Sequence, residues 1–316
     1  MASIGVVGLN YWGPNLARNF DDLADLTWLC DLDERHLTPS SARYPAARTT
    51  TDYGELLSDD SLDAVVIATP VPTHYGLAKQ ALEAGKHVFV EKPPAMRAAE
   101  MDELVSLADA RGLVLMPGHL LLYHPAVLKL KELIDAGELG DVRCVYGNRV
   151  NLGIVRTNEN ALWSLGVHDL SVILYLLDED PDLVTAQGSW SIHEGVQDVV
   201  FCFLHFPSGK IAHMHLSWLD PHKMRKMTVV GREKMAVFDD MEPDRKVTVY
   251  EKSAGPTGEL HSGDIHIPKI STAEPLRLEC SYFLELIDGQ HDRGKVARDG
   301  ARVVRALEML TNSLNG

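Results

Sequence analysis

The sequence predicts an α/β protein with an N-terminal doubly wound parallel sheet and a C-terminal α/β domain whose sheet is mostly antiparallel and open. Its 316 residues suit two domains of roughly 150 residues each. The first 120 residues alternate apolar runs with amphipathic stretches, whereas the later sequence holds closely spaced strand patterns. We therefore expect one domain at residues 1–122 and a second at residues 123–316, with the closing helices 275–316 included.

Short apolar runs predict the strands of the N-terminal domain at residues 4–7, 26–30, 64–68, 87–90 and 113–116. Because these runs do not alternate with polar residues, both faces of each strand should be covered, as in a parallel sheet. Amphipathic patterns predict helices at residues 73–84 and 97–111, which end at Gly85 and Gly112. This succession of strands and helices is typical of a doubly wound domain.

The C-terminal domain has a different pattern. Helices are predicted at residues 125–136, 160–177, 275–288 and 296–314, and a polar loop at residues 255–263. Strands are predicted at residues 142–151, 199–206, 210–218, 226–230, 235–238 and 247–250. Several of these strands alternate apolar and polar residues, which favours an antiparallel sheet with one uncovered face.

The composition of the chain argues against several classes of function. The formal net charge of −15 argues against nonspecific binding to nucleic acid or to anionic membranes, which requires basic surface. Four isolated cysteines without a CxxC pair indicate free thiols in a reducing compartment. We find neither a signal peptide pattern nor an apolar run long enough to span a membrane, and we expect a cytoplasmic protein.

A glycine-containing turn follows the first predicted strand: Gly8-Leu9-Asn10-Tyr11-Trp12-Gly13. A dinucleotide-binding fold needs glycines here for a tight turn, for approach of the backbone to a pyrophosphate and for close helix packing. The middle glycine is replaced by Asn10, which tolerates left-handed backbone angles. An ordinary strand–helix turn has the same local sequence, so the motif alone does not decide.

Asp31 strengthens the dinucleotide interpretation, because it ends the second predicted strand. A carboxylate at that place accepts hydrogen bonds from the ribose hydroxyls and repels a 2′-phosphate. Arg35, the nearest arginine, lies four residues further on. The sequence therefore predicts NAD rather than NADP as the cofactor.

The strand at residues 87–90 delivers Glu91 and Lys92 to its carboxyl end, where ligands bind in open α/β sheets. A lysine at this edge can hydrogen-bond a substrate hydroxyl and stabilise a developing alkoxide. Surface lysines are common at strand ends, so this position by itself also fits a solvated side chain.

Residues 84–93, which contain Glu91-Lys92-Pro93, resemble a signature of the glucose–fructose oxidoreductase/inositol dehydrogenase (Gfo/Idh/MocA) family of NAD(P)-dependent enzymes. The resemblance extends to residues 68–74, to residues 134–142 and to the two closing helices, and so covers almost the whole chain. It implies an N-terminal Rossmann domain, a C-terminal domain with an open sheet, and hydride transfer at a sugar or cyclitol carbinol.

The resemblance also implies the residues that hold NAD. In the family, the segment matching residues 68–74 borders the nicotinamide ribose. The predicted cofactor-binding set is Gly8, Asn10, Tyr11, Trp12, Gly13, Asp31, Thr69, Pro70, His74, Glu91 and Lys92.

The family places a histidine near the reacting hydroxyl, and His168 matches it. An aspartate often precedes that histidine by one helical turn and orients the imidazole. Here Ser164 occupies that position, and Asp169, next in sequence, should face another direction. Lys92 and His168 are the predicted catalytic residues, and the sequence leaves open which of them accepts the proton.

The segment from residue 148 to residue 163 is similar to the nucleotide-sugar 3-dehydrogenase branch that acts on UDP-N-acetylglucosamine-type substrates. Arginine forks suit phosphates, and amides suit sugar hydroxyls. We therefore predict a substrate-binding set of Arg149, Asn151, Arg156, Asn160, Trp163 and His168. Arginines salt-bridged at a strand edge would give the same pattern.

Three alternatives stay open: a 3-ketosugar reductase of deoxysugar or antibiotic biosynthesis, a dehydrogenase of a free inositol-type or inosamine-type cyclitol, and a non-catalytic dinucleotide-binding sensor or scaffold. We expect no metal site, because His213 and His215 lack a third ligand at suitable spacing. An uncovered face of the second sheet would favour a homo-oligomer, either a dimer or a tetramer.

Overall fold

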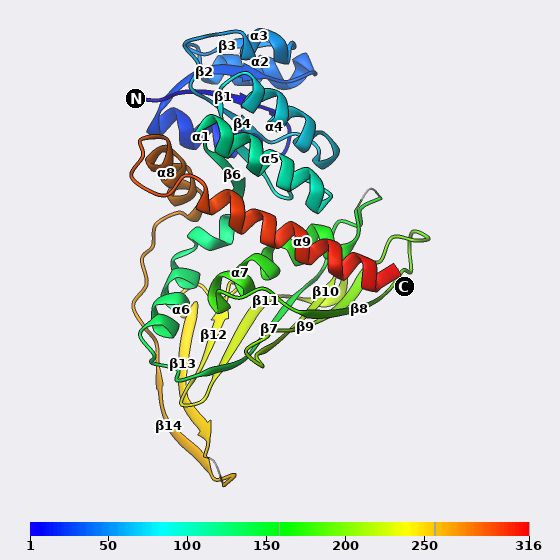
Figure 1. The fold of residues 1–316 in the computed structure, drawn as a ribbon, viewed down its shortest axis with the longest axis vertical. Coiled ribbons are helices and arrows are strands. Elements are labelled where there is room, and N and C mark those ends of the chain that lie inside the picture. The colour runs from blue at the N-terminus through cyan, green and yellow to red at the C-terminus, as the bar shows by residue number, and fades with distance from the viewer. Residues whose placement is uncertain (158, 256, 316) are drawn as a thin grey trace. The chain divides into compact units, whose positions relative to one another are not determined.

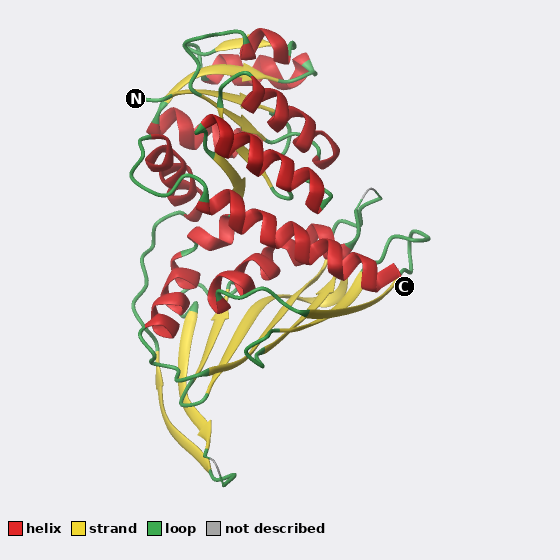
Figure 2. Ribbon diagram, in the orientation of Figure 1, coloured by secondary structure: helices red, strands yellow, loops and turns green. Residues whose placement is uncertain are grey.

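The computed structural model describes residues 1–157, 159–255 and 257–315 (Figure 1). The chain forms two compact units. Unit 1 contains Met1–Leu120 and Glu274–Arg305, and unit 2 contains Leu121–Ala273 and the chain from Ala306 onward. Each unit contains one sheet with helices packed on it (Figure 2). The predicted α/β class is confirmed.

The sheet of unit 1 is parallel throughout and has the strand order β3-β2-β1-β4-β5-β6. The order reverses between β1 and β4, which makes their carboxyl ends the expected ligand-binding edge. The strands are β1 (Ser3–Val7), β2 (Asp25–Cys30), β3 (Arg48–Thr50), β4 (Ala64–Ile67), β5 (His87–Glu91) and β6 (Leu115–Gly118).

The helices between these strands are α1 (Gly13–Leu23), α2 (Glu34–Arg43), α3 (Tyr53–Leu57), η1 (Val71–Thr73), α4 (His74–Glu83) and α5 (Ala98–Arg111). Local chemistry sets several of their ends. The carboxylate of Asp33 accepts from the amide of Arg35 at the start of α2. Gly112, with a φ of 64°, supplies the left-handed residue that ends α5.

Two helices close the chain, α8 (Pro275–Ile287) and α9 (Lys295–Asn315). We expected both in the second domain, but the segment Glu274–Arg305 belongs to unit 1. The physical reason is burial. Phe283 of α8 packs edge-on against Phe20 of α1 and Phe89 of β5, at 6.1 and 5.7 Å between ring centroids. Ala297, Ala301 and Val304 of α9 join the core on the other face of the same sheet.

The sheet of unit 2 has eight strands in the order β14-β13-β12-β11-β7-β10-β9-β8. Within this sheet, β7 and β10 form the only parallel pair among the described strands. The sheet is therefore mostly antiparallel, as predicted. The strands are β7 (Val142–Leu152), β8 (Leu183–Ser189), β9 (Val199–His205), β10 (Ile211–Ser217), β11 (Leu219–Gly231), β12 (Met235–Asp239), β13 (Val247–Ala254) and β14 (Leu260–His266).

One face of this sheet carries buried side chains such as Val145, Ala212, Met214 and Leu216. The helical elements that precede β8 in this part of the chain are η2 (Leu120–Tyr123), α6 (Pro125–Asp135), the π-helix η3 (Leu162–Gly166) and α7 (Val167–Leu177). On the opposite face, Phe201 and Phe203 remain 55% and 46% exposed. The sheet is therefore open on one side within unit 2.

The structure corrects one element of this region. The predicted polar loop at residues 255–263 includes the first residues of β14, which pairs with β13 as a hairpin. Pro256, within the predicted loop, lies outside the described residues. No helix within the described ranges is both long enough and apolar enough to cross a membrane.

Candidate active site

The turn between β1 and α1 requires its two glycines. Gly8 has a φ of +88°, and a Cβ added there would lie 2.7 Å from the carbonyl oxygen of Ala68. A Cβ on Gly13 would overlap the carbonyl oxygen of Gly8. Among the described residues, α1 has neither a side-chain cap nor an acidic residue in its first turn. Its amino-terminal amides are therefore suited to an anion such as a pyrophosphate.

The remaining residues of this turn differ in exposure. Asn10 and Tyr11 are exposed, and Tyr11 is 76% accessible. Trp12 precedes α1 as its N-cap and is half-buried. Its side chain lies near enough to the carboxyl group of Glu91 to lower the pKa of that group. Trp12 thus connects the glycine turn to the end of β5.

Asp31 is held in place by the backbone at the end of β2. Its Oδ2 accepts from the amide of Leu9 at 2.7 Å, and its Oδ1 accepts from the amide of Asp33 at 2.9 Å. His36 Nδ1 lies 3.3 Å from Oδ2. Because a carboxylate has about four lone-pair sites, Asp31 can still accept from ribose hydroxyls. Its predicted role fits this geometry.

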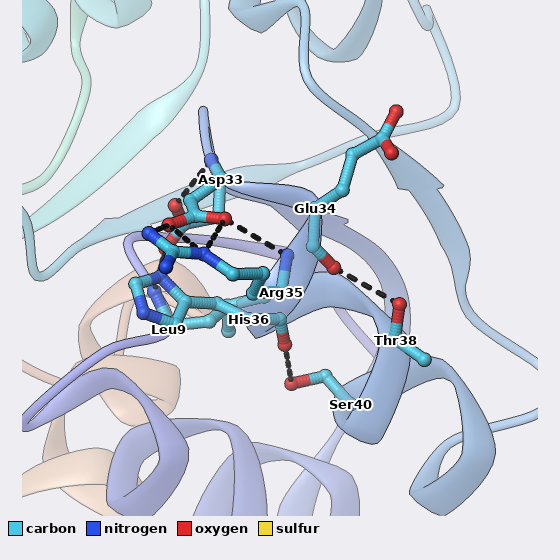
Figure 3. Close-up of polar contacts among 8 residues, drawn as sticks. Leu9, Asp33, Glu34, Arg35, His36, Thr38 and Ser40 are labelled. Atoms are coloured by element: carbon cyan, nitrogen blue, oxygen red, sulfur yellow. Dashed lines mark hydrogen bonds and ion pairs between the residues drawn. The ribbon is translucent and has the colours of Figure 1, made fainter.

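Arg35 is turned back onto Asp33, as Figure 3 shows. Its Nε lies 2.9 Å from both carboxylate oxygens of Asp33, and its Nη2 also donates to Oδ2. This fork-to-fork pairing lowers the pKa of Asp33 to about 2. The arginine nearest to Asp31 is therefore already paired with a carboxylate.

His74 belongs to the predicted cofactor-binding set, but both of its ring nitrogens are already used within the protein. It is buried, with Nδ1 2.8 Å from the carbonyl oxygen of Pro93 and Nε2 2.7 Å from that of Thr69. With both ring nitrogens on backbone oxygens, His74 braces the two loops rather than offering a polar atom to a ligand. Thr69 is half-buried and Pro70 is exposed, so these two remain candidates for ligand contact.

Glu91 and Lys92 lie at the carboxyl end of β5, and both are half-buried. The amide of Lys92 donates to Oε2 of Glu91 at 3.2 Å. Burial raises the pKa of Glu91 to about 7, against the opposing effects of the Lys92 charge and the Trp12 side chain. Glu91 therefore changes protonation near neutral pH, beside the predicted catalytic lysine.

Two buried polar residues of unit 1 were missing from the predicted site. The ring nitrogens of His119 have no hydrogen-bond partner among the described residues, and burial together with the Lys92 charge lowers the His119 pKa to about 4. Glu279 of α8 is fully buried. The available signal for Glu279 was an acid on the apolar side of a predicted closing helix.

In unit 2, Arg149 is paired with Asp169. Its Nε and Nη2 donate to Oδ1 of Asp169 at 2.9 and 2.7 Å, and both side chains are buried. Gly147 leaves room for this pair, since an added Cβ would lie 3.3 Å from Oδ2 of Asp169. The predicted substrate arginine thus joins β7, an interior strand of the sheet, to α7 through a buried salt bridge.

Two other predicted substrate residues make internal contacts. Asn160 accepts from the amide of Trp163 at 3.2 Å and donates to Gln197 at 3.0 Å. Trp163 is buried and donates its indole N–H to Thr311. Arg156 pairs with Glu159 at 2.9 Å but keeps 44% of its side chain exposed. Asn151 is half-buried.

His168 is half-buried on the first turn of α7. Asp169 points to Arg149 instead, as helical geometry leads one to expect. Ser164 accepts the indole N–H of Trp218 at 3.1 Å. The place of the family aspartate is thus part of a neutral hydrogen-bonded contact.

The described residues contain one group with metal-ligand spacing, Glu251, Asp264 and His266 on the β13–β14 hairpin. Glu251 already pairs with Lys234 and His266, each at 3.1 Å. His213 and His215 stack on Tyr146 and Phe201 at the open face of the sheet.

Comparison with known families gives two matches along the chain. Residues 2–119 match an oxidoreductase family with an NAD-binding Rossmann fold, and residues 127–237 match the GFO/IDH/MocA C-terminal domain. The chain belongs to the Gfo/Idh/MocA oxidoreductase family. Unit 1 therefore contains the NAD-binding Rossmann fold of this family.

Relatives in the Gfo/Idh/MocA family differ in their reactions. UDP-N-acetylglucosamine 3-dehydrogenase of Acidithiobacillus ferrooxidans is 26% identical over 90% of this chain and 88% of its own length. A 2,7-anhydro-N-acetylneuraminate hydratase of Escherichia coli is 30% identical over 67% of this chain. This chain spans only 60% of the length of that hydratase and 61% of the length of another relative that is also 30% identical. A dTDP-3,4-didehydro-2,6-dideoxy-α-D-glucose 3-reductase of Streptomyces violaceoruber is 45% identical over 29% of this chain and 27% of its own.

Solved structures of this family share the fold. The Acidithiobacillus enzyme superposes with a TM-score of 0.88 at 24% identity, over 99% of this chain and 97% of its own. GenD2 from gentamicin A biosynthesis, solved in complex with NAD, has a TM-score of 0.83 at 26% identity, over 99% and 94% of the two chains.

Proposed function

We propose that the protein transfers hydride between a secondary carbinol of a sugar, at C3 of a nucleotide-linked hexose, and NAD. The observation that carries this proposal is the place of Lys92 at the carboxyl end of β5, the same edge of the parallel sheet at which the Gly8–Gly13 turn follows β1 in this NAD-binding Rossmann fold. The nucleotide-sugar relative that matches 90% of the chain supports the substrate class.

The residues present fit NAD. The glycine turn leaves backbone amides open to a pyrophosphate, and Asp31 is fixed with lone pairs to spare for ribose hydroxyls. A 2′-phosphate would meet the negative charge of Asp31. When bound, NAD would supply the acceptor for the hydride.

Lys92 is the proposed electrostatic partner of the reacting hydroxyl. Its ammonium group would stabilise the alkoxide that forms before hydride leaves, which lowers the transition state more than the ground state. The hydroxyl proton would pass either to the neutral amine of Lys92, which thereby becomes that ammonium group, or to His168 while Lys92 is already charged. Departure of the hydride to NAD would then turn the carbon–oxygen single bond into the carbonyl of the product. Position 164 holds Ser164 instead of an aspartate that could orient the imidazole, so we assign His168 the weaker role.

For the substrate, the partly exposed Arg156 and Asn151 are the remaining candidates, since Arg149, Asn160 and Trp163 make internal contacts. A guanidinium group suits the diphosphate of a nucleotide sugar through charge-assisted hydrogen bonds.

The test is the appearance of reduced nicotinamide absorbance when the protein, NAD and a panel of nucleotide sugars, free sugars and cyclitols are mixed. We expect turnover with a UDP-linked N-acetylhexosamine and none with the free sugar. Equal turnover of a free cyclitol would contradict the nucleotide-sugar assignment. Binding of NAD without turnover of any member would favour the sensor or scaffold alternative.

A second candidate is a 3-ketosugar reductase, favoured by the 45% identity of one segment to a dideoxyglucose 3-reductase. The same site would run in the opposite direction, with Lys92 giving a proton to the new alkoxide. Oxidation of NADH by a 3-ketosugar nucleotide, faster than the reverse reaction, would establish this direction.

We further propose a cytoplasmic homo-oligomer. The cysteines, three buried and one half-buried, are all free, as suits a reducing compartment. The exposed aromatic rings on the open face of the second sheet form an apolar surface that a second copy could cover.

A further inference from the structure

The inward face of α8 contains one acid among apolar side chains. Its buried residues are Leu276, Glu279, Cys280, Phe283 and Leu286, at the spacing of an amphipathic helix. Glu279 has no exposed surface, and neither of its carboxyl oxygens has a hydrogen-bond partner among the described residues. A leucine or methionine would fill this position at lower cost, because burying an unpaired carboxylate is strongly unfavourable.

The packing of unit 1 brings Glu279 next to Glu91. Phe89 and Phe283 are in ring contact, and Glu91 follows Phe89 by two residues on β5, so both point to the same side of the sheet. Glu279 precedes Phe283 by one turn of α8 and shares its face. Gly118 of β6 makes room here, since a Cβ would lie 3.3 Å from Oε1 of Glu91.

The titratable and charged groups near Glu91 and Glu279 come from β5, from the segment after β6 and from α1. The end of β5 contributes Glu91 and Lys92, and the segment after β6 contributes the unpaired ring of His119. From α1, Arg18 and Asp22 pair with Glu274 and Arg277 at the exposed start of α8. Burial first, and then the charge of Glu91, raise the pKa of Glu279 well above its usual range. If both ionised, two buried carboxylates would repel each other, and the charge of Lys92 acts on Glu91.

We propose that Glu279 is a positioning residue that acts on Lys92 through Glu91: it keeps its proton while Glu91 ionises, so that a single carboxylate charge lies beside Lys92 instead of a repelling pair. A second carboxylate would hold the ammonium form of Lys92 to higher pH and impede its exchange of a proton with substrate. This role rests on the proposed function of Lys92, but the protonation of Glu279 does not.

The first experiment measures that protonation. Infrared difference spectra of the whole protein would be recorded at mildly alkaline pH, above the value of about 7 for Glu91. We expect the carbonyl stretch of a protonated carboxyl group in the wild type, its loss in Glu279→Gln and its retention in Glu91→Gln. Absence of the band from the wild type, or its persistence in Glu279→Gln, would overturn the proposal.

Stability gives an independent readout. Because folding raises the pKa of Glu279, its contribution to stability is present at acidic pH and is lost as the pH rises above the ordinary glutamate value. The unfolding midpoint of Glu279→Gln should therefore exceed that of the wild type by a difference that grows with pH. A constant difference would show that Glu279 ionises normally. The matched control is Glu285→Gln, an exposed acid on the same helix that pairs with His291.

The kinetic experiment addresses the action on Lys92. A neutral amide replaces a neutral carboxyl group, so Glu279→Gln should retain kcat within about twofold at neutral pH. The alkaline limb of its kcat/KM profile should move to lower pH, because no second carboxylate can form, whereas Glu285→Gln should follow the wild type. Identical profiles in Glu279→Gln and the wild type would refute the positioning role. If the wild type proves inactive on every sugar, the proposed function fails, and the infrared result still decides the state of Glu279.

Discussion

Asp31 is fixed at the end of β2 by two backbone amides, and two residues further on Asp33 holds Arg35 in a bidentate pair. In NADP-dependent relatives of this fold type, an arginine near this position accepts the 2′-phosphate. Here Arg35 is present, but its guanidinium group is already paired with Asp33. We therefore propose that cofactor choice depends on two acids: Asp31, which would bind the ribose, and Asp33, which holds Arg35.

We predict that Asp31→Ser weakens NAD binding by about tenfold, the loss of charge-assisted hydrogen bonds to ribose. Adding Asp33→Asn should release Arg35 and raise NADP affinity beyond the level of the single variant. Titration calorimetry with both cofactors measures the change. The gain should vanish when Arg35→Ala is added, and a gain that survives this third substitution would exclude Arg35 as its source.

The second residue-level prediction separates Lys92 from His168. Lys92→Met should reduce hydride transfer on the order of a hundredfold or more with NAD affinity retained, since it removes an electrostatic stabiliser of the transition state. His168→Asn should leave measurable activity. Single-turnover rates at saturating NAD provide the comparison. A His168 variant as inactive as the Lys92 variant would identify the histidine as the base.

Residue-level prediction from sequence was most informative where a backbone requirement or strand end fixes the position. Gly8, Gly13, Asp31 and Lys92 lie where a strand–turn–helix pattern puts them. Sequence could not show that Arg149 would pair with Asp169, because that contact depends on which face of α7 meets β7. The bracing role of His74 was equally hidden, since its partners are backbone carbonyl oxygens and one of them, that of Pro93, lies 19 residues further along the chain.

At the scale of elements, α8 completes the core of unit 1. Phe283 contacts both Phe20 and Phe89 and is fully buried, although the stretch Leu121–Ala273 of unit 2 separates α8 from these residues in sequence. Edge-to-face aromatic contacts of this kind add to the stabilisation from area burial alone.

We predict that Phe283→Ala destabilises unit 1 by about 3–5 kcal/mol, the usual cost of a large cavity in an aromatic core. Thermal unfolding and NAD binding should both reveal the loss. Tyr282→Ala, at the neighbouring half-buried position where the ring stacks on His291, should cost much less. Equal destabilisation by both variants would mean that the aromatic core is not the cause.

Elements with strong periodicity were predicted within a few residues, such as α4, α5 and α6. No pattern in the sequence predicted α2 or β3. Helix α2 contains Pro39 and several polar residues, and β3 is only three residues long. No pattern predicted β14 either, whose residues are all exposed and show no apolar alternation. Such elements form because a neighbouring strand or helix supplies partners, and no local pattern records that neighbour.

At the scale of the whole molecule, the open face of the second sheet presents exposed aromatic side chains that a second copy could cover. His213 stacks on Tyr146 at 5.0 Å, His215 stacks on Phe201 at 4.4 Å, and Phe203 lies beside them on β9. These rings form a flat apolar surface on adjacent strands.

We predict a homo-oligomer that Phe201→Glu disrupts, because burying the new carboxylate against a second copy is unfavourable. Sedimentation velocity should show a smaller species than the wild type. Met241→Glu, at an exposed site outside this face, should sediment like the wild type. A monomeric wild type would contradict the predicted assembly.

The division of unit 1 into two stretches of chain has a consequence for protein synthesis. The β-sheet that binds the cofactor emerges first from the ribosome, but α8, which covers Phe20 and Phe89, emerges only after Ala273. Until then the side of the sheet that carries Phe89 is covered by α1 without α8, while all of the second sheet is already available to fold. Nascent chains arrested before Glu274 should therefore expose protease-sensitive sites within residues 1–120. The region that is translated first cannot be completed until the second sheet has left the ribosome.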